Sequence, residues 1–245
     1  MFKNTKGLIL REVRYKEADR ILTILTESDG KITAKARGAL RKTSRTGAAT
    51  QQLTYSELTL FGNRGKWTVN EAVIAEPFQG LRERIEDFAL GSYFAECLEA
   101  FSVEDEPEPE LLQLGLNSLY ALSRSLYPAR QIKAAFELRL MCIAGFRPQV
   151  EACPVCGKPE PEEPVLAPES GAVCCRACKK EGRSYRLGKS SLPALRYVVS
   201  APARQLFSFR VDDEGLYELS RAAEAYVLDH AERRFPTLDY YKQFT

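Results

Sequence analysis

The chain has 245 residues, of which 44% are hydrophobic and 28% are charged. These proportions are near the average for folded globular proteins, so they exclude the disordered and fibrous classes. The most apolar stretch, residues 138–146, contains Arg139 and is much shorter than the roughly 18 apolar residues of a membrane span. The N-terminal residues lack the apolar run of a signal peptide, so we expect a cytoplasmic protein.

Charge is distributed unevenly, although the formal net charge is only +2. Residues 1–79 hold 14 Lys or Arg against 8 Asp or Glu, whereas residues 80–140 hold 6 against 11. The remaining residues are nearly balanced, with 15 against 14. A basic first third predicts a surface for a polyanion, and the acidic segment predicts a different role for the part that follows.

Five segments of the first third have the β-branched and aromatic composition of strands: residues 7–13, 20–26, 31–37, 53–61 and 67–74. Asp29-Gly30 indicates a tight turn between the second and the third. Five short strands predict a small closed barrel, and the OB-fold is the commonest such barrel that presents a basic surface. We therefore predict an OB-fold β-barrel over residues 1–79.

Helical spacing follows, and we predict three helices before the cysteine-rich segment: residues 81–101, 111–127 and 129–146. The first places Leu81 and Ile85 on one face and must end at the acidic, Pro-interrupted loop 102–110. Beyond the cysteines, Asp213 is predicted to cap a further helix. The expected organisation is an OB-fold domain (1–79), a helical domain in two parts (80–150 and 183–245) and an insert between them (151–182).

Five of the seven cysteines fall within residues 151–182, where Pro is frequent and apolar periodicity disappears. They include two C-x-x-C pairs, separated by 18 residues, which is the spacing of a four-thiolate zinc site. The insert is too small to bury a stabilising core, and four thiolates leave no open coordination position for catalysis. We therefore predict a structural Zn²⁺ bound by Cys153, Cys156, Cys175 and Cys178.

Alternatives stay open for these cysteines. The loop could have lost its metal, could bind iron, or could act in redox chemistry. Cys174 adjoins Cys175 and competes with it as a ligand, although the spacing favours Cys175. Cys97 and Cys142 lie on apolar helical stretches, where a cysteine is most often a small buried side chain.

A concentration of positive charge lies at Lys31, Lys35, Arg37, Arg41, Lys42 and Arg45, with no acidic residue among them. Gly38 and the following Ser and Thr residues predict a flexible loop along which long cationic side chains could follow a phosphate backbone. A charge run is often only a solvated face. Here the single sign and the place in a predicted OB barrel favour nucleic-acid binding.

Further residues are candidates for the same surface. Arg64 and Lys66, in the next hairpin, are predicted to extend it, as are Arg14 and Lys16 near Tyr15. Trp67 or Tyr55 could stack bases, although an aromatic residue in a strand more often belongs to the core.

Motifs of catalysis are absent from the sequence. It contains no Gly-rich phosphate loop, no G-x-S-x-G and no H-E-x-x-H. The single histidine, His230, lies on the apolar side of the C-terminal helix and is predicted to be a packed residue. The acidic loop 102–110 has no rigid element to hold catalytic metal ions. We therefore predict no catalytic residues and no enzymatic activity.

Several short segments together resemble, in order and spacing, the RecO family of DNA repair proteins. They include GLILR at 7–11, YKEADRILT at 15–23, FELRL at 136–140, GFRP at 145–148 and CPVCG at 153–157. The resemblance implies an N-terminal OB domain, a helical domain and a zinc-finger insert. It implies DNA contacts at Lys35, Arg37, Arg41, Lys42 and Arg45, and zinc ligands at the four paired cysteines. The family's usual Gly-Gly before the third ligand is Gly171-Ala172 here.

The resemblance also implies a bacterial, nucleoid-associated function. Such proteins bind single- and double-stranded DNA, anneal complementary strands, engage the C-terminal tail of single-strand-binding protein, and with RecR help to load RecA. We expect the acidic tail to bind an apolar pocket rimmed by Lys or Arg. Two alternatives from other classes are a zinc-ribbon nuclease or nucleotidyl transferase, and an RNA-binding or transcription factor with an OB-fold and a zinc ribbon.

Overall fold

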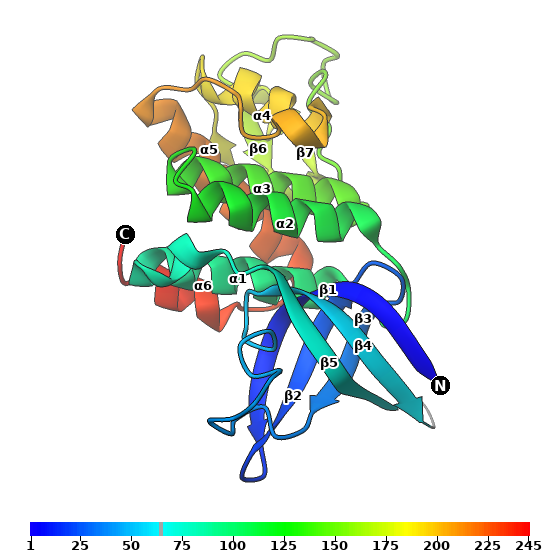
Figure 1. Cartoon of the computed structure of the whole chain (residues 1–245). Coiled ribbons are helices and arrows are strands. Elements are labelled where there is room, and N and C mark those ends of the chain that lie inside the picture. Colours follow the sequence, from blue (N-terminus) through cyan, green and yellow to red (C-terminus); the bar gives the residue numbers. More distant parts are fainter. Residues whose placement is uncertain (64–65) are drawn as a thin grey trace. The chain divides into compact units, whose positions relative to one another are not determined.

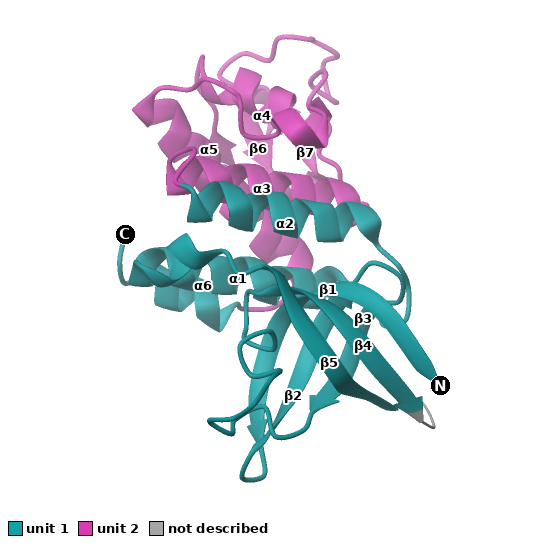
Figure 2. Ribbon diagram, viewed as in Figure 1, with its two compact units in different colours: residues 1–124, 235–245 teal, residues 125–234 magenta. Residues whose placement is uncertain are grey.

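The computed structural model describes residues 1–63 and 66–245, which form two compact units. One unit comprises residues 1–124 and 235–245, and the other residues 125–234 (Figure 2). Across the described ranges, no helix combines the length and apolar character that a membrane crossing requires.

The first unit begins with a closed barrel whose strand order is β1-β2-β3-β5-β4 (Figure 1). Its strands are β1 (Phe2–Tyr15), β2 (Asp19–Thr26), β3 (Gly30–Ala36), β4 (Tyr55–Asn63) and β5 (Lys66–Glu76). Neighbours pair antiparallel except β3 and β5, which run parallel. This barrel, followed by helices and a cysteine-rich insert, confirms the predicted fold class.

β1 closes the barrel, because it is long enough to pair with β4 along its first half and with β2 along its second half. Residues 2–8 pair with β4 and residues 7–15 pair with β2. The register with β2 shifts between Ile9 and Arg11, so a bulge lies at Leu10. A bulge bends a strand and increases its twist, as a strand shared by two sides of a barrel must.

Side chains that point into the barrel form its core, and the side chains between them lie on its outer face. The core comprises Ile9, Leu22, Ile24, Ile32, Ala34, Ala36, Ala39, Leu58, Leu60 and Val69. On β3 the buried residues Ile32 and Ala34 alternate with Lys31, Thr33 and Lys35, which therefore lie on the outer face. The cations of β3 are thus available to other elements or to solvent.

The helices of this unit are η1 (Gln79–Arg82), α1 (Ile85–Phe101), α2 (Pro109–Ser123) and α6 (Pro236–Tyr241). α1 packs against β1, β2, α2 and α6. Phe235, just before α6, meets Tyr93 of α1 edge-on at 5.7 Å between ring centroids. The predicted start of the first helix at Leu81 is wrong, because Arg84 is extended (φ −132°, ψ 131°) and separates η1 from α1. Ile85 is consequently 54% exposed.

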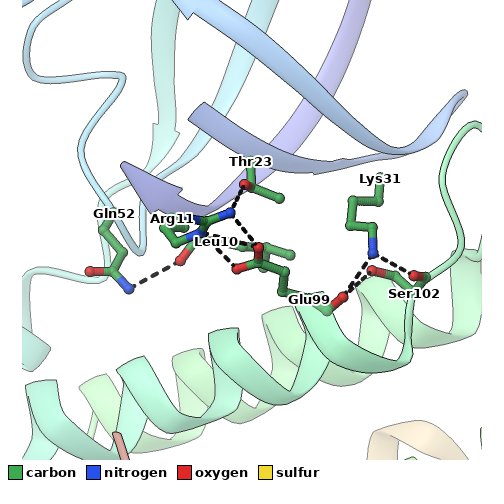
Figure 3. A network of polar contacts seen from close by, with 7 residues as sticks. All are labelled: Leu10, Arg11, Thr23, Lys31, Gln52, Glu99 and Ser102. Carbon is green, nitrogen blue, oxygen red and sulfur yellow. Dashed lines mark hydrogen bonds and ion pairs between the residues drawn. The ribbon is translucent and has the colours of Figure 1, made fainter. Parts of the chain in front are cut away.

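A polar network joins the outer face of the barrel to the C-terminal end of α1 (Figure 3). The Lys31 ammonium donates to the carbonyl oxygens of Glu99 (2.9 Å) and Ser102 (2.7 Å). The Arg11 guanidinium lies 2.8 Å from the Glu99 carboxylate and also donates to Thr23. The last turn of α1 has no basic residue of its own, so Lys31 supplies the positive charge that its free carbonyl groups favour.

The second unit contains α3 (Ala129–Ile143), β6 (Val165–Ala167), η2 (Pro168–Ser170), β7 (Ala172–Cys174), η3 (Arg176–Cys178), β8 (Tyr185–Arg186), α4 (Ser191–Ser200), η4 (Ala203–Gln205) and α5 (Asp213–Ala231). The three short strands form one sheet in the order β7-β6-β8. α5 is capped by Asp212, whose carboxylate accepts from the Gly215 N–H at 2.8 Å. The predicted cap at Asp213 is therefore wrong by one residue.

Two arginines, from the segments 136–140 and 145–148, bind the C-terminal end of α4. Arg139 donates to the carbonyl oxygens of Val198 and Ala201, each at 2.5 Å. Arg147 donates to that of Val199 at 3.0 Å. α4 has no basic residue in its last turn, so these two side chains satisfy carbonyl groups that the helix leaves without intrahelical partners.

A buried charge cluster lies between α3 and α5. The Lys133 ammonium is 2.7 Å from the Glu137 carboxylate and 2.9 Å from that of Glu224. Burial lowers the pKa of Lys133, but the two carboxylates outweigh burial and raise that pKa above its usual value. Lys133 therefore stays charged and balances Glu137, whose side chain is fully buried.

Replacement of Lys133 by Met should destabilise the second unit by about 3 kcal/mol, because it leaves the Glu137 charge buried without its cation. The double variant Lys133→Met/Glu137→Leu should recover much of this loss, since it removes both buried charges. Urea unfolding followed by circular dichroism measures both. Equal destabilisation by the single and double variants would contradict a charge-balance role.

Candidate nucleic-acid interface and metal centre

Five of the eight predicted DNA-binding residues lie at the end of the barrel where β1 ends and β2 begins: Lys35, Arg37, Arg41, Lys42 and Arg45. Tyr15 pairs with Asp19, and Ile21 pairs with Lys35. This register places the turn 16–18 beside the end of β3, after which the loop 37–54 begins. Most of the predicted cations therefore belong to one edge of the barrel.

The loop 37–54 is held by many hydrogen bonds, in contrast to the flexible loop expected from its composition. Arg20 donates to the Gly47 carbonyl at 2.7 Å and to the Thr50 hydroxyl at 3.1 Å. Leu40 and Leu53 donate backbone N–H groups to Ala18 and Ile9, respectively. Ala39 and Ala49 are buried. The loop is thus a series of turns packed on the end of the barrel, and its cationic side chains project from a positioned backbone.

Four cations of the loop 37–54 are exposed: Arg37, Arg41, Lys42 and Arg45. In the part of the chain that the structure describes, none of these four cations forms an ion pair. Since no carboxylate has to be displaced, their charge is directly available to phosphates.

Lys35 is less free than these four residues. Its ammonium lies 2.8 Å from the Asp19 carboxylate, which also accepts the Gly38 N–H at 2.8 Å. The bond from Lys35, followed by that from Gly38, lowers the pKa of Asp19. Asp19 thus joins the start of β2 to the end of β3 and fixes the first turn of the loop.

Lys31 does not belong to the exposed group. It is half-buried; its ammonium binds the C-terminal end of α1, and its backbone binds the segment that follows α1. The preceding Gly30 (φ +61°) packs so closely that a Cβ would lie 1.8 Å from the Glu106 carbonyl oxygen. A phosphate would have to displace α1 from Lys31, so this predicted DNA contact is better explained as a structural one.

The β4–β5 hairpin contributes one described cation. Lys66 is exposed at the start of β5, whereas Arg64, the other predicted contact, lies outside the described residues. Val69 aligns with Ala36 in the parallel β3–β5 pair. Lys66 is three residues earlier, so it lies about 10 Å back along the strand from the start of the loop 37–54.

The two aromatic residues considered for base stacking are already engaged. Trp67 packs against the barrel core and over Gly62, where an added Cβ would lie 2.7 Å from its ring. The Tyr55 hydroxyl donates to Glu27. Burial, followed by that hydrogen bond, raises the pKa of Tyr55. Tyr15, which the sequence singled out only as a neighbour of basic residues, is the exposed aromatic at the basic end of the barrel.

The four paired cysteines converge in the second unit. The Sγ atoms of Cys153, Cys156, Cys175 and Cys178 all lie within 4.8 Å of one another. The first pair sits in a turn closed by the Gly157 N–H, which donates to the Cys153 carbonyl at 2.9 Å. Gly157 has φ +74°, a conformation that glycine adopts without strain. In the second pair, Cys175 directly precedes η3 and Cys178 is the last residue of η3.

These sulfurs fit a tetrahedral metal ion. Ligands about 2.3 Å from a tetrahedral ion lie about 3.8 Å from one another, and Cys156 and Cys175 are 3.7 Å apart. Burial raises the pKa of Cys153, but backbone N–H groups directed at its sulfur lower that pKa to about 6. The pKa of Cys178 is raised to about 12, first by its hydrogen bond with Cys156 and then by burial. Close sulfurs repel one another's charge, and a bound cation would relieve this repulsion.

The structure distinguishes Cys174 from the four converging cysteines. Cys174 lies in β7, pairs with Val165 and is buried, whereas Cys175 belongs to the cluster. Ala172, at the position of the family's second glycine, is also in β7 and has no left-handed backbone conformation. Gly171 alone takes that conformation (φ +65°), so alanine at 172 is compatible with the turn.

His230 has the environment expected of a packed residue. Its ring centroid lies 4.8 Å from that of Phe146 and 4.3 Å from that of Tyr226. Its Nδ1 is 2.9 Å from the Tyr226 carbonyl oxygen, one helical turn back.

Cys175→Ser should abolish stoichiometric metal binding and Cys174→Ser should preserve it, because only Cys175 belongs to the converging set. Metal content by atomic emission and the thermal unfolding midpoint, with and without a chelator, measure the two effects. Loss of metal from Cys174→Ser with retention in Cys175→Ser would reverse the ligand assignment.

Comparison with known proteins agrees with this architecture. A family profile described as "Recombination protein O N terminal" matches residues 1–78, and one described as "Recombination protein O C terminal" matches residues 82–239. A protein of Acetivibrio thermocellus named DNA repair protein RecO is 33% identical over 242 residues, which cover 98% of this chain and 96% of the relative. A protein of the same name from Symbiobacterium thermophilum is 32% identical, over 97% of this chain and 95% of the relative. Another, from Rubrobacter xylanophilus, is 31% identical, over 93% of this chain and 91% of the relative. The chain belongs to the recombination protein O (RecO) family.

Proposed function

We propose that the protein is a mediator of recombinational DNA repair that binds single- and double-stranded DNA and anneals complementary strands. The observation that carries this proposal is the set of exposed, unpaired cations on the loop 37–54. In this proposal residues 1–79 form the DNA-binding domain. Residues 80–150 and 183–245 form the helical domain that carries the insert 151–182.

The charge distribution supports strand annealing. Arg37, Arg41, Lys42 and Arg45 project from a backbone that hydrogen bonds already hold, so little ordering is needed when DNA binds. Phosphate contacts release counterions and do not depend on base sequence. Two complementary strands whose phosphates are partly neutralised repel each other less, which favours their pairing.

We propose a structural Zn²⁺ as the metal of the four-cysteine site. Four thiolates close the coordination sphere, and the ion would contribute folding free energy to the insert.

The protein's own DNA-binding and metal-binding groups suggest no catalytic step, so we propose a non-enzymatic role. A cytoplasmic, nucleoid-associated location agrees with relatives that are named DNA repair proteins.

Partner binding is proposed for the second unit. A cleft of about 980 Å³ in this unit is lined in part by the apolar residues Pro161, Val165, Leu187 and Leu192. Arg176, Arg186 and Lys189 also line it, as do Glu160 and Glu163. A cleft whose lining includes both apolar side chains and three basic residues suits the acidic C-terminal tail of single-strand-binding protein. We also propose that the protein cooperates with RecR to load RecA.

Replacing Arg37, Arg41 and Lys42 together with Ala should weaken binding to single-stranded oligonucleotides. The log–log salt slope should fall by up to about 2, at about 0.7 per lost phosphate contact. Fluorescence anisotropy titrations at several salt concentrations measure both, and an unchanged slope would contradict the proposed footprint.

The protein should also leave labelled DNA at its original length in the presence of magnesium and nucleotides.

Lys31→Met and Arg41→Met form a matched pair for this experiment, because each removes one positive charge from the same unit. Arg41→Met should reduce the salt slope and leave stability unchanged. Lys31→Met should leave the slope nearly unchanged and lower the free energy of unfolding by about 2 kcal/mol, since its ammonium binds the end of α1.

A peptide with the sequence of the single-strand-binding protein tail should bind the intact protein in a calorimetric titration. Replacing Arg176, Arg186 and Lys189 with Ala should weaken that binding. Replacing the exposed Arg204 and Arg210 of the same unit should not, because neither lines the cleft. Peptide binding that is equally weakened by both sets would rule out this cleft.

A further inference from the structure

Tyr15 is an exposed aromatic residue at the basic end of the barrel. It is the last residue of β1 and is 43% exposed. It pairs with Asp19 across the short turn 16–18, in which Lys16 takes a left-handed conformation (φ +54°). The ring is therefore attached to a strand end that the β1–β2 pairing holds in position.

Two ammonium groups lie near the Tyr15 ring. The Nζ atoms of Lys35 and Lys16 are 5.0 Å and 5.6 Å from its centroid. Both distances are within the range of cation–π attraction, which is weak when the groups are exposed to water. A nucleobase stacked on an aromatic ring is held more strongly than an exposed ammonium, so a base would displace a lysine from the ring. The displaced Lys16 ammonium would then be free to meet a phosphate beside that base, while Lys35 stays paired with Asp19.

Other aromatic side chains of the barrel fit this role less well. Trp67 packs against the core, and Tyr55 is bound to Glu27. Phe2 and Phe61 are exposed but contact each other, with ring centroids 5.1 Å apart. They lie toward the opposite end of β1, where Lys3 and Lys6 form ion pairs with Asp29 and Glu57.

We propose that Tyr15 is the base-stacking residue of the DNA site and makes it prefer single strands. The preference arises because a base within a duplex is covered by its neighbours, whereas a base in a single strand offers its face to the ring. This inference deepens the proposed function and rests on it, since it assigns to one residue the discrimination between two forms of the same ligand.

Tyr15→Ala should weaken binding to a thymidine oligonucleotide by roughly tenfold, as expected from the loss of one base stack. It should leave binding to a duplex, and to an abasic oligonucleotide of equal length, within about twofold of the parent protein, because their phosphate contacts persist. Tyr15→Phe should retain the parent affinity for all three. Anisotropy titrations measure these affinities.

Tyr120→Ala is the matched control. Tyr120 lies in α2, is 46% exposed and has the Arg124 guanidinium 5.7 Å from its ring centroid. It therefore has the exposure and the cation–π contact of Tyr15 but belongs to the acidic segment. Its replacement should not change any of the three affinities.

Tyr15→Trp provides a direct measurement of stacking. Its fluorescence should be quenched by the thymidine oligonucleotide and not by the abasic one, relative to the parent protein, whose Trp67 packs against the core. Equal loss of affinity for all three ligands in Tyr15→Ala, or no loss for any, would overturn the stacking assignment and leave DNA binding intact. Failure of the parent protein to bind any of the three would refute both the assignment and the proposed function.

Discussion

The bond network between Lys31 and the end of α1 determines which part of the barrel surface is free. Lys31, on β3, satisfies two carbonyl groups there, while Arg11, on β1, pairs with Glu99 (Figure 3). Together they fix the C-terminal half of α1 to one part of the outer face. The outer face near the turn 16–18 and the loop 37–54 keeps its exposed cations. One barrel thus has a structural and a free basic region, although the sequence shows a single run of positive charge.

The free region combines two properties that usually oppose each other. Long cationic side chains remain exposed, yet the backbone that carries them is held by Arg20, by the Asp19 carboxylate and by buried alanines. A cation on a positioned backbone loses less conformational entropy when it binds a phosphate than a cation on a disordered tail. The four paired cysteines of the second unit follow the same logic, because turns and short strands bring their sulfurs together.

Much of the architecture could be predicted from the sequence. The alternation along β3 reflects a strand with one buried face, and the two C-x-x-C pairs converge as their spacing predicts. The division of the basic residues could not be predicted, because the partner of Lys31 is about 70 residues away along the chain. The local sequence marks neither end of α4, because no side chain caps its first turn and Arg139 and Arg147 stabilise its C-terminal end from outside the helix. The short helix α6 depends on distant contacts with α1 in the same way.

The position of the DNA can be measured by ultraviolet crosslinking of a bromodeoxyuridine oligonucleotide, followed by mass spectrometry of the adducts. We expect adducts at Tyr15 and in the peptides that contain residues 37–45, and none at Lys31 or in residues 99–106, which cover it. Adducts confined to residues 125–234, or concentrated around Lys31, would show that the DNA lies elsewhere and would contradict the assignment of the free basic region.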